Sequence, residues 1–260
     1  MILIGERINA SRVPISQAIE NGNATLIEAE AISQANAGAD YIDVNAGTFY
    51  RDEGEKLAWL VRTVQAVTDK PLCIDTADPN ALLHGLQEHR GRALVNSVTM
   101  QKERLEAFLP ILKRYDCRVV GMCLNDFGVP GTVEGRVELA TSLIDILRTE
   151  GIAPQDIFID PVVHALSTDQ KAAWATLETA KAIQERHPEV LTICGVSNVS
   201  FGLPGRRKLN QVFLVLAINA GIGAAILDPT DSEMIIALKS AQVLLGKDDF
   251  CINYISQFRK

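Results

Sequence analysis

Short apolar runs alternate along the chain with longer segments in which apolar residues recur every three or four positions. The runs are rich in Ile, Val, Leu and Ala, and their length and composition predict β-strands. The runs that predict strands cover residues 2–6, 41–47, 72–76, 93–98, 118–125, 157–161, 192–198 and 224–229. Near-continuous apolar character is typical of parallel strands that helices cover on the outside.

The segments between the runs carry signals for the ends of helices. Asp78 precedes a proline and can act as an N-cap, and Thr132 can cap a helix that ends near Gly151. The longest connections are expected after the first and the seventh strand, at residues 10–23 and 200–207. Long loops at these places often serve function.

Eight strand–helix units in a chain of 260 residues predict a (β/α)8 TIM barrel, which belongs to the α/β class. A doubly wound open sheet has the same order of elements and is the alternative. No linker or change in composition divides the chain. We therefore expect residues 1–260 to form a single barrel domain.

Composition excludes several classes of protein. Hydrophobic residues make up 47% and charged residues 22% of the chain, which is typical of a globular protein. The net charge of −7 argues against a nucleic-acid partner, and no apolar run is long enough to span a membrane. The start of the chain lacks the apolar stretch of a secretory signal. Five cysteines without a CxxC pair predict a reduced, cytoplasmic protein.

Polar residues follow every predicted strand. The carboxyl ends of barrel strands form the floor of the active site in this fold. The polar residues there are Glu6, Asn9, Asp43, Asn45, Asp75, Asn96, Asn125, Asp160, Asn198 and Asp228. Any one of them could simply cap a helix or join two loops. A polar group buried without a partner costs on the order of 1–3 kcal/mol, so the complete ring predicts a polar ligand.

The chemistry of this ring favours a planar heterocycle. An Asp can accept two adjacent N–H groups from an amino-amidine edge, and Asn can both donate and accept, so pterins and purines fit. Mg²⁺ also prefers such oxygens, but barrel sites for catalytic metals commonly include His. His164 alone lies near the predicted rim, and we interpret it first as a loop residue. No nucleophile elbow, HExxH or P-loop motif is present.

Six motifs at the predicted strand ends together resemble the pterin-binding methyltransferases. In chain order they are IGERINAS, DVNAG, CIDT, VNS, IDP and GVSNVSFGLPGR. Each motif alone is weak, but six in order cover nearly the whole chain. The resemblance is to the methyltetrahydrofolate:corrinoid protein methyltransferases, and the folate module of cobalamin-dependent methionine synthase is similar.

The resemblance implies a TIM barrel that forms a homodimer. It also implies transfer of a methyl group between N5 of tetrahydrofolate and the cobalt of a corrinoid, such as cobalamin, that a partner protein carries. Tetrahydrofolate or 5-methyltetrahydrofolate would be the substrate, and the chain itself would bind no metal. The direction of transfer stays open.

The same resemblance assigns roles to individual residues. It implies that Asp75, Asn96 and Asp160 hold the pterin ring. Asn198 would hydrogen-bond near N5 and is the candidate catalytic residue, and Arg206 matches a basic position in the following loop. Further candidates for the pocket are Glu6, Asn9, Asp43, Asn45, Asn125 and Ser197.

Two departures from related proteins limit the assignment. The zinc-and-homocysteine module of methionine synthase is missing, so we do not expect this chain to make methionine alone. The GGxSTRP-type loop of dihydropteroate synthase is also missing, although a dihydropteroate-synthase-like enzyme stays an alternative.

Two further classes of protein stay open on the residues alone. A metal-dependent barrel lyase or hydrolase could use the same Asp residues, and a non-catalytic module could bind folate without transferring a methyl group. The basic residues 206–208 form either a solvated loop or a site for the glutamate tail or an acidic partner.

Overall fold

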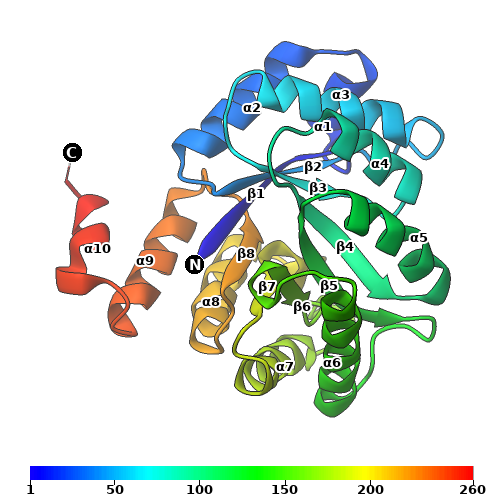
Figure 1. Cartoon of the computed structure of the whole chain (residues 1–260). Coiled ribbons are helices and arrows are strands. Elements are labelled where there is room, and N and C mark those ends of the chain that lie inside the picture. The colour runs from blue at the N-terminus through cyan, green and yellow to red at the C-terminus, as the bar shows by residue number, and fades with distance from the viewer. Residues whose placement is uncertain (260) are drawn as a thin grey trace.

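A computed structural model describes residues 1–259 of the chain, and its centre is a closed barrel of eight parallel strands (Figure 1). The strands are β1 (Ile2–Asn9), β2 (Tyr41–Asn45), β3 (Leu72–Asp75), β4 (Leu94–Met100), β5 (Arg118–Asn125), β6 (Ile157–Asp160), β7 (Leu191–Gly195) and β8 (Ala224–Leu227). The first strand pairs with the last, with Ile4 opposite Ile226. The predicted (β/α)8 barrel is therefore confirmed, and the open-sheet alternative is wrong.

Helices surround the barrel on its outer side (Figure 1). The α-helices are α1 (Val13–Glu20), α2 (Ala24–Asn36), α3 (Glu53–Gln65), α4 (Pro79–Glu88), α5 (Lys102–Arg114), α6 (Val133–Thr149), α7 (Ala172–Arg186), α8 (Arg206–Asn219), α9 (Ser232–Leu244) and α10 (Ile252–Ser256). Short 3₁₀ helices are η1 (Pro154–Asp156), η2 (Val196–Ser200) and η3 (Asp249–Cys251).

Local sequence signals fix several of the helix ends. The Asp78 carboxylate accepts a hydrogen bond from the N–H of Asn80, and the Thr132 hydroxyl accepts one from Gly135. Gly151 has a φ of 91°, which a residue without a side chain adopts easily. The long loop predicted at residues 10–23 is wrong, because α1 occupies most of it. The side chain of its N-cap, Arg12, makes no capping hydrogen bond, so the usual signal is absent.

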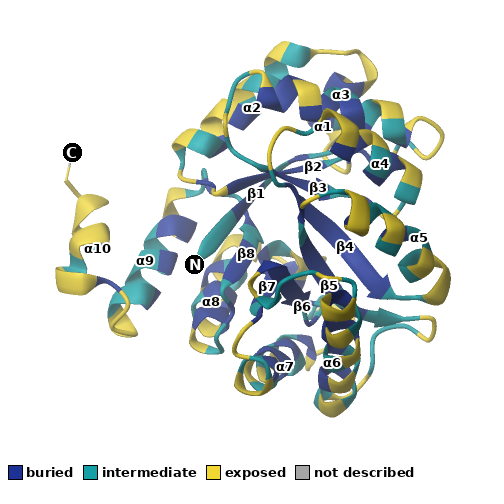
Figure 2. Ribbon diagram, in the orientation of Figure 1, coloured by how far each residue is buried: buried dark blue, intermediate teal, exposed yellow. Residues whose placement is uncertain are grey.

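The barrel interior is filled with side chains. Each strand contributes one buried residue to a central layer, which consists of Ile4, Tyr41, Cys73, Leu94, Val120, Phe158, Ile193 and Ala224. A second apolar layer lies between the strands and the helices, whose inward faces are buried (Figure 2). A filled interior leaves only the two ends of the barrel for a ligand.

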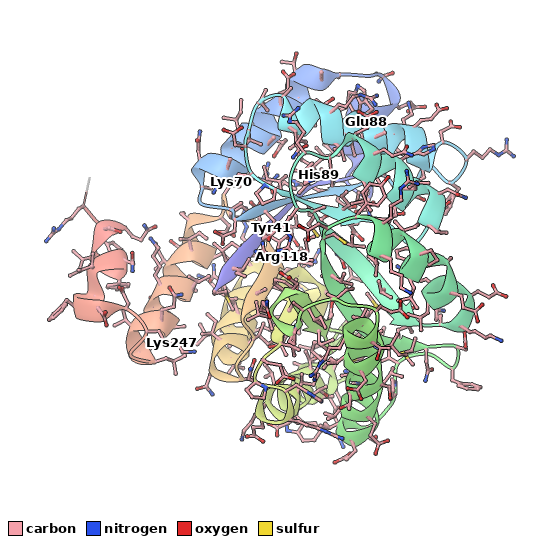
Figure 3. All side chains as sticks on the ribbon, viewed as in Figure 1. Tyr41, Lys70, Glu88, His89, Arg118 and Lys247 are labelled. Atoms are coloured by element: carbon pink, nitrogen blue, oxygen red, sulfur yellow. The ribbon has the colours of Figure 1, made fainter. Side chains whose placement is uncertain are left out.

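Ion pairs close the amino end of the barrel. Arg118 contacts the hydroxyl of Tyr41 beside it (Figure 3) and donates to the Asp156 carboxylate at 3.2 Å. Arg92 donates to the other Asp156 oxygen at 2.9 Å. The hydrogen bond from Arg92 is the main reason why the pKa of Asp156 lies below its usual value. These contacts leave the carboxyl end as the open end.

The segment after α9 lies outside the barrel. Figure 1 shows α10 beyond α9, away from the strands, and Figure 2 shows it as mostly exposed. Phe250 in this segment is 88% exposed, and Leu244, the last residue of α9, is 82% exposed. Over the part of the chain that the structure describes, no helix combines the length and apolar character needed to cross a membrane.

Candidate functional site

A cavity of about 910 Å³ opens at the carboxyl end of the barrel. Nine of the eleven candidate residues predicted from the sequence line it, and they come from five strands, from the turn after β7 and from the start of α8. They are Glu6, Asn9, Asp43, Asp75, Asn96, Asp160, Ser197, Asn198 and Arg206. The volume is within the usual range for small-molecule sites.

Asp75 and Asn96 form one wall of the cavity, with Asn45 behind them. Parallel pairing places Asn45 beside Asp75 and Asp75 beside Asn96. The Asn45 amide donates to the Asp75 carboxylate at 2.9 Å and to its carbonyl at 3.2 Å. Burial raises the pKa of Asp75 to about 6, although the bond from Asn45 acts in the opposite direction. Asn45 therefore positions Asp75.

Asp43 lies one layer deeper on β2. It pairs with Cys73 in the parallel ladder and is only 2% exposed. Within residues 1–259, its Oδ2 atom has no hydrogen-bond partner. Burial, reinforced by the charge of Asp75, raises the pKa of Asp43 well above its usual value. The floor of the cavity can thus hold a proton.

Asp160 stands on another side of the cavity, at the end of β6. Its carboxylate accepts a 2.7 Å hydrogen bond from the N–H of Val162, and burial raises its pKa to about 6. Val162 has a φ of 67°, which is strained for a β-branched residue. Buried Arg136 donates to the carbonyls of Pro161 and Val162 at 3.0 and 3.1 Å. Asp160 and Arg136 together hold the strained turn.

Asn198 projects from η2, the short turn after β7. Its side chain is exposed in the cavity, and no hydrogen bond joins it to the rest of residues 1–259. A Cβ at Gly195 would lie 2.9 Å from the Asn198 amide nitrogen, so a larger residue there would displace the Asn198 side chain. Arg206 donates to the Ser197 carbonyl at 2.9 Å and to the Ser200 hydroxyl at 3.1 Å. Arg206 therefore braces the turn that presents Asn198.

Glu6 and Arg7 both line the cavity, although they are consecutive in β1. The strand has one residue more than β2 between the pairs Gly5–Ile42 and Ile8–Val44, and this bulge lies opposite Asp43. Simple alternation along the strand predicts only one inward side chain here. Alternation therefore does not predict that Arg7 lines the cavity. The only sequence signal for this position is a charged residue within an otherwise apolar strand.

Arg7 is held by acidic groups. It donates to both oxygens of Glu30 and to Asp228 at 2.8 Å. The hydrogen bond to Glu30 is the largest cause of the raised pKa of Arg7. Burial raises the pKa of Asp228, but its bonds to Thr230 and Arg7 outweigh this, so the net pKa is lowered. Asp228 is therefore an ionised partner of Arg7.

Two candidate residues do not line the cavity. Asn45 supports Asp75 from behind, and Asn125 accepts a hydrogen bond from the N–H of Phe127 and so closes a tight turn. His164 is exposed and also lies outside the lining. The lining residues that the sequence did not single out include Arg12, Met122, Asn210 and Asp231, whereas Arg207 belongs to the basic segment noted at residues 206–208. They lie in loops, at the starts of helices or between the motif positions. A prediction based on polar residues at strand ends does not reach these places.

The acidic side chains of the cavity are arranged as separate hydrogen-bond acceptors. Across residues 1–259, no three His, Cys, Asp or Glu side chains converge where they could hold a metal ion. The cavity instead offers acceptors around one side and a carboxamide on another. Such an arrangement suits a flat ligand with several N–H groups.

A closed barrel with this ring of acceptors suits a planar, polar ligand, and comparison with known proteins identifies the family of the chain. Residues 5–228 match the family described as "Pterin binding enzyme", and the chain belongs to that family. The family resemblance expected from the six motifs is confirmed.

Individual relatives agree with the family. A methylcorrinoid:tetrahydrofolate methyltransferase of Eubacterium limosum is 37% identical over 262 residues, which cover 100% of this chain and 97% of the relative. A methionine synthase of Mycobacterium leprae (strain TN) is 30% identical over 240 residues, or 87% of this chain but 20% of the relative. Among solved structures, a dihydropteroate synthase from Xanthomonas albilineans has the same fold. Its TM-score is 0.70 at 19% identity, with 94% of this chain and 92% of that chain covered.

Proposed function

We propose that the protein is a methyltransferase that moves a methyl group between N5 of tetrahydrofolate and the cobalt of a corrinoid held by a partner protein. One observation carries this proposal: Asp75 and Asp160, whose pKa values are raised by burial, line one cavity together with the Asn198 amide. The full-length similarity to the methyltransferase of E. limosum supports the same activity. The corrinoid is a substrate of the reaction and not a group of this chain.

The carboxyl groups would bind the pterin ring. Asp75 and Asp160 would accept hydrogen bonds from its amino edge, and Asn96 would fix its orientation. Their raised pKa values, about 6 for both Asp75 and Asp160, leave them ionised above neutral pH and able to accept. Ligand N–H groups would remove the cost of burying these charges.

Asn198 would act at the other end of the ring, near N5. When a methyl group leaves N5, the nitrogen gains electron density and must be protonated or strongly hydrogen-bonded. A carboxamide fixed by a braced turn can stabilise this change without having to reorient. In the opposite direction the same amide would orient the N5 lone pair toward the methyl carbon.

The direction of transfer depends on whether the corrinoid of the partner protein arrives with or without a methyl group. The E. limosum relative is a methylcorrinoid:tetrahydrofolate methyltransferase, which favours methylcorrinoid as the methyl donor. A direct test mixes the protein with methylcobalamin and tetrahydrofolate, then with reduced cobalamin and methyltetrahydrofolate, without oxygen. The cobalt absorption spectrum reports transfer in either direction. Binding of methyltetrahydrofolate without any spectral change would instead favour a non-catalytic folate-binding module.

We further propose a homodimer in the cytoplasm, with a corrinoid-carrying protein as the second partner. Exposed Val212 and Leu216 on α8, together with the apolar segment after α9, support an apolar contact between two copies. Free thiols at all five cysteines support a reducing compartment. Light scattering at several concentrations tests the dimer, and a monomeric mass would exclude it.

A further inference from the structure

Glu6 stands beside the turn that carries Asn198. The Ser197 hydroxyl lies 2.7 and 2.6 Å from the two carboxylate oxygens of Glu6. In the part of the chain that the structure describes, no other side chain hydrogen-bonds this carboxylate. Both residues line the cavity, so a ligand placed against Asn198 lies within reach of them.

The surroundings of Glu6 make it a better proton acceptor than an exposed glutamate. Burial is the main cause of its raised pKa, and the Asp228 charge adds to it. The hydrogen bond from Ser197 and the charges of Arg12 and Arg206 act in the opposite direction but do not cancel the rise. A proton acceptor works best when its pKa is close to the working pH.

Asp43 on β2 is a second acidic group near Glu6, in addition to Asp228. It is already the preferred site for a proton on the cavity floor, because its burial is nearly complete. Asp228 stays ionised by its bonds to Thr230 and Arg7. Glu6 is less buried than Asp43. Unlike Asp228, which pairs with Arg7, Glu6 forms no ion pair within residues 1–259.

The proposed reaction requires a proton to leave. The N5 lone pair of tetrahydrofolate attacks the methyl carbon, the cobalt–carbon bond breaks, and its electron pair stays on cobalt, which passes from Co(III) to Co(I). N5 then carries both a methyl group and its original hydrogen, with a positive charge. Its proton must go to a base, and the neutral Asn198 amide cannot be that base.

We infer that Glu6 is the catalytic base of this reaction and takes the N5 proton through the hydroxyl of Ser197. The Ser197 hydrogen passes to a Glu6 oxygen while Ser197 Oγ receives the proton from N5, so the hydroxyl is restored. In the reverse direction the same path returns the proton to N5. This role rests on the proposed function, and it assigns Glu6 to proton transfer where the motif resemblance implies only a place in the pocket.

Single-turnover methyl transfer from methylcobalamin to tetrahydrofolate tests the role. The wild-type rate should fall as pH is lowered and Glu6 becomes protonated. Glu6→Gln should be slower by roughly 10²–10⁴-fold and should lose this pH dependence, with unchanged affinity for tetrahydrofolate. Glu6→Ala should recover rate when formate is added, because a small carboxylate can replace the missing base. Glu233→Gln, an exposed change on α9, is the matched control.

Each outcome has a distinct meaning. A Glu6→Gln protein with the rate and pH profile of the wild type overturns the inference, and so does a variant that loses only affinity for tetrahydrofolate. Ser197→Ala should be slowed less than Glu6→Gln, because water can replace a hydroxyl. If the wild-type protein transfers no methyl group in either direction, the proposed function fails, and the role of Glu6 fails with it.

Discussion

The Asn45 side chain holds the Asp75 carboxylate and the Asp75 backbone carbonyl at the same time, at 2.9 and 3.2 Å. Its own oxygen accepts the N–H of Gly47 at 3.0 Å. The two contacts with Asp75 join the ends of the neighbouring strands β2 and β3, and the contact with Gly47 fixes the Asn45 side chain in the turn after β2. Asp75 therefore faces the cavity with its position already set before any ligand arrives.

Asn45→Ala should weaken folate binding, although Asn45 itself does not line the cavity and would not contact the ligand. Without the amide, Asp75 loses a donor worth about 1 kcal/mol, and its pKa rises above about 6 because the Asn45 bond no longer opposes burial. We expect an affinity loss of roughly 5–10-fold that grows as pH falls. Calorimetric titration with tetrahydrofolate checks this, with Asn80→Ala on α4 as the control. An unchanged dissociation constant would show that Asp75 needs no support.

Asp160→Asn should stabilise the ligand-free protein and weaken its binding. Because the pKa of about 6 exceeds that of an unfolded Asp, folding favours the protonated carboxyl, and stability falls as pH rises through about 6. The asparagine has no charge to bury. We expect a gain of about 1–2 kcal/mol above pH 6, allowing for water in the open cavity, and none below about pH 4.

Thermal unfolding at two pH values measures this difference for Asp160→Asn. A gain of about 2–4 °C for each kcal/mol is expected for a chain of this size. Asp145→Asn, on the exposed side of α6, removes a charge of the same kind outside the cavity. A stability gain that is equal at both pH values would contradict the burial argument.

Asn198→Ala should lower the turnover number by roughly 10²–10³-fold, with a smaller loss of ground-state affinity. The reason is that the amide projects into the cavity and, in the proposed complex, faces the atom whose charge changes during transfer. Asn219→Ala, at the far end of α8, is a matched control. Stopped-flow measurement of the cobalt spectrum gives the rate. An unaltered turnover number would show that Asn198 has no role in the methyl-transfer step.

Arg206→Ala should slow turnover by roughly tenfold while tetrahydrofolate affinity changes little. Its two hydrogen bonds hold the turn that presents Asn198, and bonds from a charged donor are worth about 1.5–3 kcal/mol. Lys208→Ala is the control, because Lys208 contacts Gln211 and does not line the cavity. Steady-state kinetics separates the two parameters. A loss confined to affinity for polyglutamylated folate would instead assign Arg206 to the glutamate tail.

The sequence predicts the fold of this protein well, because each strand is short, apolar and closed by a polar residue. It also predicts most of the cavity, since parallel strands in a barrel end at the same side. Asn45 and Asn125 show where this reasoning stops. Both are carboxamides at strand ends, yet one turns back toward Asp75 and the other closes a tight turn. A strand-end position alone does not indicate which partner a side chain will find.

Arg7 and the pair formed by Glu6 and Ser197 could not be predicted for different reasons. A bulge in β1 turns both Glu6 and Arg7 toward the cavity. No residue type in the strand predicts the position of this bulge. Glu6 meets Ser197 across 191 positions of sequence. Only closure of the barrel brings them together, and local patterns carry no information on contacts of that range.

The same closure divides the cavity into parts that depend on different stretches of the chain. The third, fourth and sixth strands supply Asp75, Asn96 and Asp160, whereas the first strand supplies Glu6 and the turn after the seventh strand supplies Ser197 and Asn198. In the proposed complex, the residues that bind the ring therefore come from the middle of the chain, whereas the residues near the methyl group and the proton are brought together only by pairing of the last strand with the first. A chain cut after the sixth unit would keep Asp75, Asn96 and Asp160 but would lack Ser197 and Asn198, so under the proposed function it could not transfer the methyl group.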